Sequence, residues 1–180
     1  MDILSHGLWA TTVARAYNLN AKEPVKLRRA FLWGMFPDLF AFGLPFIYRI
    51  FQMVTGAVPW TSFRPPHENG QSIPMYDLSH TLYNYSHSLI IFGIVFALVW
   101  WLRQRRPPRS MLGWLLHIIS DIPTHTYAFF PTPVFFPVWN WMFDGMSWAQ
   151  PWFLATDYGL LIAVNVLVSV VRARREKRKT

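Results

Sequence analysis

The sequence contains no cysteine and few charged residues for its length. Without cysteine, the chain can form no disulfide and can offer no thiolate to a metal ion. Any metal site must therefore use His, Asp, Glu and water. Charged residues make up 14% of the 180 residues, whereas soluble domains carry roughly 25%. Hydrophobic residues make up 53%, and stretches such as residues 89–102 contain no charge. This composition indicates a protein of the lipid bilayer.

Basic residues outnumber acidic ones, and most of them lie in three short stretches. The formal net charge is +8, and the stretches are residues 22–29, 103–109 and 172–179, each beside an apolar segment. Lys and Arg accumulate on the cytoplasmic side of membrane helices, where they contact anionic headgroups. We therefore predict a multi-pass protein of the inner (cytoplasmic) membrane with a cytoplasmic C-terminus. The lipid bilayer, and not nucleic acid, is the expected partner of these stretches.

Five apolar segments predict an all-α fold, an integral membrane bundle of about five membrane-embedded helices. The segments are residues 3–17, 30–54, 83–102, 111–130 and 153–171. The first would reach only ~22 Å, so a tilted, partly inserted or buried helix is expected there. In this organisation residues 1–171 form a membrane-embedded helical domain and residues 172–180 a basic cytoplasmic tail. The Trp-rich loop 131–152 is expected at the membrane interface, as an anchor or as a lid.

Ionisable residues nonetheless occur within these apolar segments. Each costs on the order of 2.5 to 3.5 kcal/mol in the bilayer and usually faces the interior of the bundle. Residues 111–130 carry His117, Asp121 and His125 at spacings of four, so successive members share a helix face. Two ligands one turn apart can bind one metal ion. His125 is expected to serve a second ion, unless Pro123 bends the helix and brings it inward.

Three further segments each contribute one residue of the same kind. His6, Asp38 and His87 lie among small or helix-perturbing neighbours, which permit close helix packing. Any one of these residues alone could simply hydrogen-bond to a neighbouring helix. Their number on four segments favours a metal site instead. The predicted ligands are His6, Asp38, His87, His117, Asp121 and His125.

Three more ionisable residues are assigned lesser roles. Asp157 lies one turn into residues 153–171, and it is expected only to cap the helix or pair with a neighbour. His80 precedes His87 by about two helical turns and could reach the same face. A surface or capping role is nevertheless predicted for both His67 and His80.

The order of the motifs resembles the bacterial family of membrane-bound metal-dependent hydrolases described as LexA-regulated. The matching motifs are SHG at residues 5–7, WGMFPD at residues 33–38, YSHS at residues 85–88 and HIISDIPTH at residues 117–125. That family is similar to the zinc-dependent phospholipase C and single-strand nuclease superfamily, whose helical domains bind zinc through His and Asp, including an HxxxD pair. The resemblance implies a set of metal ligands in which the last two form that pair: His6, Asp38, His87, His117 and Asp121.

These observations together predict a membrane-bound, metal-dependent hydrolase. One to three Zn²⁺ ions, or other divalent ions, would activate water, with Asp38 or Asp121 as the catalytic base. A lipid phosphodiester is the expected substrate, because lipids reach a site in the bilayer by lateral diffusion. Two alternatives stay open: transport of metal ions or protons, and a non-catalytic protein with a structural metal. An open coordination position favours the enzyme, a closed four-ligand shell the structural site, and a continuous polar path the transporter.

Overall fold

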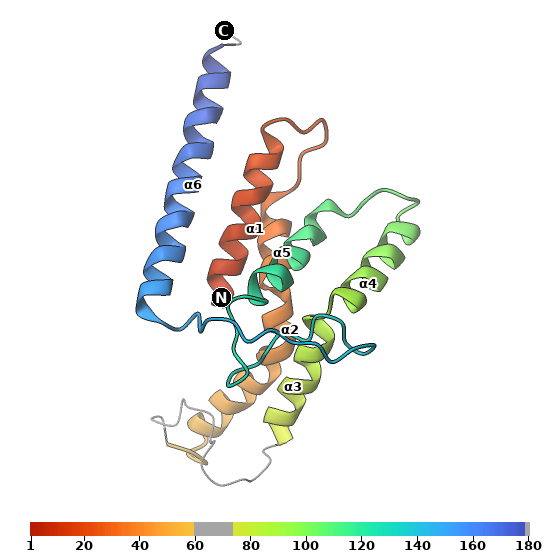
Figure 1. Cartoon of the computed structure of the whole chain (residues 1–180), viewed down its shortest axis with the longest axis vertical. Helices are drawn as coiled ribbons and strands as arrows, with labels where there is room; N and C mark the ends of the chain where they lie inside the picture. Colours follow the sequence, from red (N-terminus) through yellow and green to blue (C-terminus); the bar gives the residue numbers. More distant parts are fainter. Residues whose placement is uncertain (60–73, 179–180) are drawn as a thin grey trace.

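The computed structural model describes residues 1–59 and 74–178, and within them the fold is entirely helical, as predicted. The helices are α1 (Ile3–Asn18), α2 (Leu27–Val54), α3 (Pro74–Ser86), α4 (Leu89–Leu102), the short 3₁₀ helix η1 (Arg109–Met111), α5 (Leu112–Asp121) and α6 (Pro151–Lys177). Figure 1 shows α1, α2 and α5 at the centre of the bundle, between α6 and α4. The prediction for His67 falls on residues outside the described ranges.

Two helices, α2 and α6, are long and apolar enough to cross a membrane. Helices α3 and α4 meet at a bend of 59° and would add a third span if the bent pair crosses as one. These lengths and compositions indicate a membrane protein. They do not by themselves confirm the predicted number of about five membrane-embedded helices, because α1 and α5 are shorter than a full span.

The segment predicted as one helix over residues 83–102 is broken at His87 and Ser88. The hydroxyl of Ser88 accepts hydrogen bonds from the first backbone N–H groups of α4, which caps this helix. The same hydroxyl donates to the Phe136 carbonyl at 2.6 Å. The backbone N–H of Leu89 also donates, at 2.9 Å, to the Val134 carbonyl. The loop that follows α5 therefore holds the bend in place.

The prediction of a helix over residues 111–130 is wrong in its C-terminal half, because α5 ends at Asp121. Pro123 has no backbone N–H to continue the helical ladder. The N–H groups of Thr124 and His125 both bond to the Asp121 carbonyl, each at 3.1 Å, in a turn. At the other end of the chain, α6 continues through Lys177, so most of the predicted tail extends this helix.

Helices α1, α2 and α5 cross at glycines that leave no room for a side chain. A Cβ atom on Gly34 of α2 would lie 2.6 Å from the His6 carbonyl oxygen. A Cβ atom on Gly113 of α5 would lie 2.7 Å from the Ala30 carbonyl oxygen. Real Cβ atoms do not approach oxygen so closely, so glycine is required at both crossings. At these crossings α1, α2 and α5 pack closely together beside the predicted ligands.

The described residues of the three basic stretches, 22–29, 103–109 and 172–178, lie toward one end of the bundle (Figure 1). Arg109 forms an ion pair with Glu23 in the loop between α1 and α2. The hydrogen bond from Arg109 and its positive charge lower the pKa of Glu23. Arg175 of α6 donates to the Leu19 carbonyl at 2.9 Å in the same loop. The clustering of positive charge at one end agrees with the predicted common location of the three stretches.

Candidate metal centre

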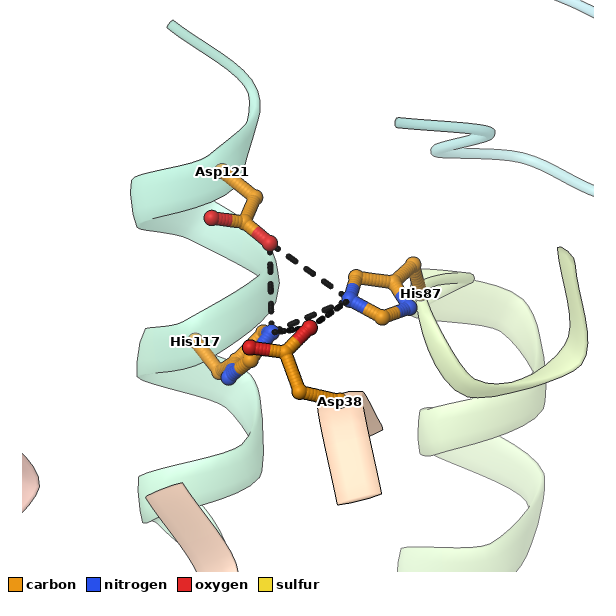
Figure 2. Close-up of side chains that lie close together, drawn as sticks. All are labelled: Asp38, His87, His117 and Asp121. Carbon is orange, nitrogen blue, oxygen red and sulfur yellow. Dashed lines mark hydrogen bonds and ion pairs between the residues drawn. The ribbon is translucent and has the colours of Figure 1, made fainter. Parts of the chain in front are cut away.

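Four buried side chains converge from three parts of the fold, as Figure 2 shows. One nitrogen or oxygen atom from each lies within 4.8 Å of the others, and the four residues are Asp38, His87, His117 and Asp121. All four belong to the set predicted from the sequence. The structure thus places together, in a position to bind one metal ion, residues that are up to 83 positions apart in the chain.

Each of the four residues is positioned by a specific local feature. Asp38 follows Pro37 in the middle of α2, while His117 and Asp121 lie one turn apart on α5. His87 lies at the bend between α3 and α4, after the last residue of α3 and before the first residue of α4. The contact of Gly113 with α2 brings the two facing helices close enough for their side chains to meet.

The distances between the four ligand atoms fit a small divalent ion. The Nε2 atoms of His87 and His117 are 3.0 Å apart, and they lie 3.4 and 3.1 Å from Asp121 Oδ2. Asp38 Oδ1 is 3.6 Å from the first of these nitrogens and 3.7 Å from the second. In a tetrahedral zinc site with bonds of about 2.0–2.1 Å, ligand atoms are about 3.3–3.4 Å apart. Five of the six distances scatter around this value, from 3.0 to 3.7 Å, and the Asp38–Asp121 pair lies within 4.8 Å.

The histidines of the cluster turn their Nε2 atoms toward its centre. The Nδ1 atom of His117 lies 2.6 Å from the Gly34 carbonyl oxygen, and that of His87 lies 3.2 Å from the Tyr83 carbonyl oxygen. A carbonyl can only accept, so the contact with Gly34 assigns the proton of a neutral His117 ring to Nδ1, whereas Nδ1 of His87 also lies 2.9 Å from the Ser86 hydroxyl, which can donate or accept. With the proton on Nδ1 of both rings, each Nε2 atom would carry a lone pair, which is the arrangement found in metal-binding histidines.

Two more histidines approach the same carboxylate from its other oxygen. His6 Nε2 is 2.9 Å and His125 Nε2 is 3.5 Å from Asp121 Oδ1. The Nδ1 atom of His125 lies 2.7 Å from the Phe130 carbonyl oxygen, and that of His6 lies 3.3 Å from the Ser120 hydroxyl. All four rings therefore use Nδ1 outside the centre. His125 reaches Asp121 although α5 has already ended, because the turn after Asp121 folds it back.

Several atoms of the centre are buried without a hydrogen bond. Within the described part of the chain, His6 Nε2, His125 Nε2 and Asp121 Oδ2 have no partner with hydrogen-bond geometry. The short His6–Asp121 contact thus meets a distance criterion but lacks the angle of a hydrogen bond. Buried polar atoms are normally satisfied by a partner or by a metal ion. Imidazole and carboxylate ligands together suit zinc and other divalent transition metals, so the residues fit a metal ion.

The N-terminal amine and one tyrosine join the cluster, and sequence reasoning missed both. The Met1 amine lies 2.7 Å from Asp121 Oδ1 and 3.0 Å from the Thr124 hydroxyl. The ring of Tyr83 stacks on His87 with centroids 3.7 Å apart, and its hydroxyl is 3.1 Å from His125 Nδ1. The one-turn spacing of Tyr83 and His87 in the sequence could have indicated that these two rings stack.

The residues with lesser predicted roles lie outside the four-residue cluster. Asp157 accepts hydrogen bonds from Ser5 Oγ at 2.5 Å and from Trp9 Nε1 at 2.7 Å. It therefore pairs with α1, in agreement with the prediction. The ring of His80 stacks on Phe130 with centroids 4.2 Å apart.

Comparison with protein-family models, with curated proteins and with solved structures found no match for this chain. The geometry of the centre is therefore the basis for a functional assignment. Four ligands converge in it, two further histidines contact the carboxylate of Asp121, and the whole group is buried.

Proposed function

We propose that this protein is a metal-dependent hydrolase of the cytoplasmic membrane that acts on a phosphodiester or phospholipid-type substrate, with zinc as the preferred ion. The observation that carries the proposal is the cluster of four buried ligand residues, Asp38, His87, His117 and Asp121, with His6 and His125 beside the other oxygen of Asp121. The proposal includes about five membrane-embedded helices and a cytoplasmic C-terminus.

The two positions differ in the number of ligands that the chain provides. The first would use four residues: Asp38, His87, His117 and Oδ2 of Asp121. The second would use His6, His125 and Oδ1 of Asp121. Three protein ligands with room for a further group are typical of catalytic zinc, whereas four are typical of structural zinc. An enzyme would need water or substrate at the second position in the place that the Met1 amine takes, 2.7 Å from Asp121 Oδ1.

The chain itself supplies the other parts of a hydrolytic site. A bound divalent ion would contribute Lewis-acid activation of water and of the substrate oxygen. Asp121 is fully buried and faces both positions, so its role is to hold the ions. Asp38 is 5% exposed and would use only Oδ1 at the first position, so its other oxygen is the better candidate for the base that accepts a proton from water.

The placement of the centre supports a lipid-type substrate. His6 lies at the start of α1 and Asp121 at the end of α5, and both ends are remote from the basic loops that join these helices to their neighbours (Figure 1). The loop after α5 carries exposed aromatic residues, including Tyr127, Trp139 and Phe143. Aromatic residues of this kind favour the headgroup region. Asp38 lies near the middle of α2, so the centre is at mid-depth of this candidate membrane span.

One specific observation favours a structural metal as the second candidate. The four residues of the first position complete a tetrahedral set by themselves, as structural zinc sites do. If only this position is filled, no coordination site is left for a substrate. A hydrolysis assay on protein of known metal content separates the two candidates.

The full chain, purified in mild detergent with zinc, is expected to hydrolyse bis(p-nitrophenyl) phosphate or phosphatidylglycerol in mixed micelles. A chelator should abolish this activity and added zinc should restore it, because the ion supplies the activation of water. Asp38→Asn should lower the rate by at least about 10²–10⁴-fold, the usual contribution of a general base, because it removes both the candidate base and a ligand of the first position. Released nitrophenol or the separated lipid products give the measurement.

The control is Asp144→Asn, the same chemical change at an exposed aspartate in the loop after α5. It should keep both the rate and the metal content. Protein that carries stoichiometric zinc but hydrolyses neither phosphodiester would support the structural metal and contradict the proposed enzyme.

A further inference from the structure

A second polar feature lies far from the metal centre, between the basic ends of α1 and α6. A cavity of about 350 Å³ opens there. Three arginines line it, Arg15 from α1 and Arg172 and Arg175 from α6. Leu27 and Val168 provide apolar wall on either side. Neither the predicted hydrolase chemistry nor the packing of the helices uses this cavity.

Two of the arginines are held in place by neutral partners. Arg15 donates to Asn165 Oδ1 at 2.6 Å and to Ser169 Oγ at 3.0 Å, both on α6. Arg175 donates to the Leu19 carbonyl and to Asn20 in the loop after α1. In the described residues neither guanidinium pairs with a carboxylate. Their positive charges are therefore positioned but not neutralised.

The third arginine has only partial compensation. Arg172 bonds to Glu176 Oε1 at 2.8 Å on the exposed surface of α6, and Glu176 also lines the cavity. Three arginines against one glutamate leave a formal charge of +2 in the cavity. This positive charge favours an anion as the ligand of the cavity. Guanidinium groups match the oxygens of a phosphate with paired hydrogen bonds, which makes a phosphate the preferred anion.

The surroundings of the cavity indicate a phosphate that belongs to a lipid. The cavity lies at the basic end of α6, a helix long and apolar enough to cross the membrane. Below it α6 exposes a continuous apolar surface that includes Leu160, Leu167 and Val170. Acyl chains that descend from a headgroup in the cavity would run along this surface. Basic pockets between membrane helices on the cytoplasmic side bind anionic headgroups in this way.

We propose that the cavity between α1 and α6 binds the headgroup phosphate of one anionic glycerophospholipid, such as phosphatidylglycerol. The inference does not depend on the chemistry of the metal centre. The cavity lies between two helices that otherwise meet through a few polar contacts. A lipid bound there would therefore stabilise the packing of α6 against α1.

The test uses the full chain in a mild detergent and measures lipid retention by native mass spectrometry. Phosphatidylglycerol should bind in a ratio of one per chain and about tenfold more tightly than phosphatidylcholine. Arg172→Gln should weaken phosphatidylglycerol binding by about fivefold, the effect of one basic residue near a lipid surface. Glu176→Gln should strengthen it by a similar factor, because a negative charge is removed from the cavity.

The matched control is Arg103→Gln, the same change in another basic stretch at the same end of the bundle. It should leave binding unchanged. Both variants in the cavity are at exposed positions, so they are expected to fold. Metal content is measured on the same samples, so that a loss of the metal centre can be told apart from a loss of lipid binding. Equal effects of Arg103→Gln and Arg172→Gln, or equal binding of the two lipids, would overturn the proposal. Displacement of the lipid by millimolar inorganic phosphate would assign the cavity to free phosphate instead.

Discussion

Replacement of Asp121 by asparagine is expected to remove the bound metal completely. The two oxygens of this carboxylate face both positions, with His6 at 2.9 Å on one side and His117 at 3.1 Å on the other. Asparagine keeps the size but loses the charge and one acceptor oxygen. Because the ion is worth several kcal/mol to the reaction, hydrolysis should fall by about 10³-fold or more. Elemental analysis of the purified variant and the phosphodiester assay measure the two effects.

Two variants serve as controls for this prediction. Asp157→Asn makes the same change at another buried carboxylate, which bonds to Ser5 and Trp9 and lies outside the cluster, so the metal content should persist. His6→Ala removes a ligand of the second position only, so about one of two ions should remain. An Asp121→Asn protein with the metal content of the wild type would contradict the shared role of this residue.

The substitution Gly34→Ala is expected to be the most damaging small change in the fold. The added Cβ would lie 2.6 Å from the His6 carbonyl oxygen and 2.8 Å from Ala10 Cβ, so α1 and α2 would have to separate. The free energy of unfolding should fall by about 2–3 kcal/mol, as for other overpacked sites. Metal content should fall as well, because the Gly34 carbonyl orients His117 and the neighbouring backbone carries His6. Denaturant unfolding in micelles gives the first quantity.

Gly43→Ala is the matched control on the same helix. A Cβ atom at Gly43 meets nothing within 4 Å, so no packing is disturbed. Alanine favours a helix over glycine by up to about 1 kcal/mol, and a neutral or slightly stabilising effect is expected. Equal stability of the Gly34→Ala and Gly43→Ala proteins would mean that the helices do not cross as closely as described.

The sequence alone predicted the helical fold and the pairing of His117 with Asp121. Both depend on local regularities, an apolar segment of sufficient length and a spacing of one helical turn. Asp38 and His87 were identified only as ionisable residues in apolar segments, and the sequence could not show that they meet. Their meeting depends on the crossing of α2 and α5, which is a property of the whole bundle.

The features that the sequence did not predict depend on contacts between distant segments. The bend at His87 is held by the loop that carries Val134 and Phe136, and nothing near His87 in the sequence indicates those partners. The end of α5 follows from Pro123, but the return of His125 to Asp121 also requires the Phe130 carbonyl that orients its ring. The polar contacts between α1 and α6 likewise join residues about 150 positions apart.

The most direct test of a metal centre is elemental analysis of the wild-type protein, purified with divalent metals present, before and after treatment with a chelator. The four-residue and three-residue positions predict about two zinc or other divalent ions per chain, removed by the chelator. A protein that holds no stoichiometric metal under these conditions would contradict the account. The histidines and aspartates would then form a buried hydrogen-bond network, and the proposed hydrolase would fall with the metal.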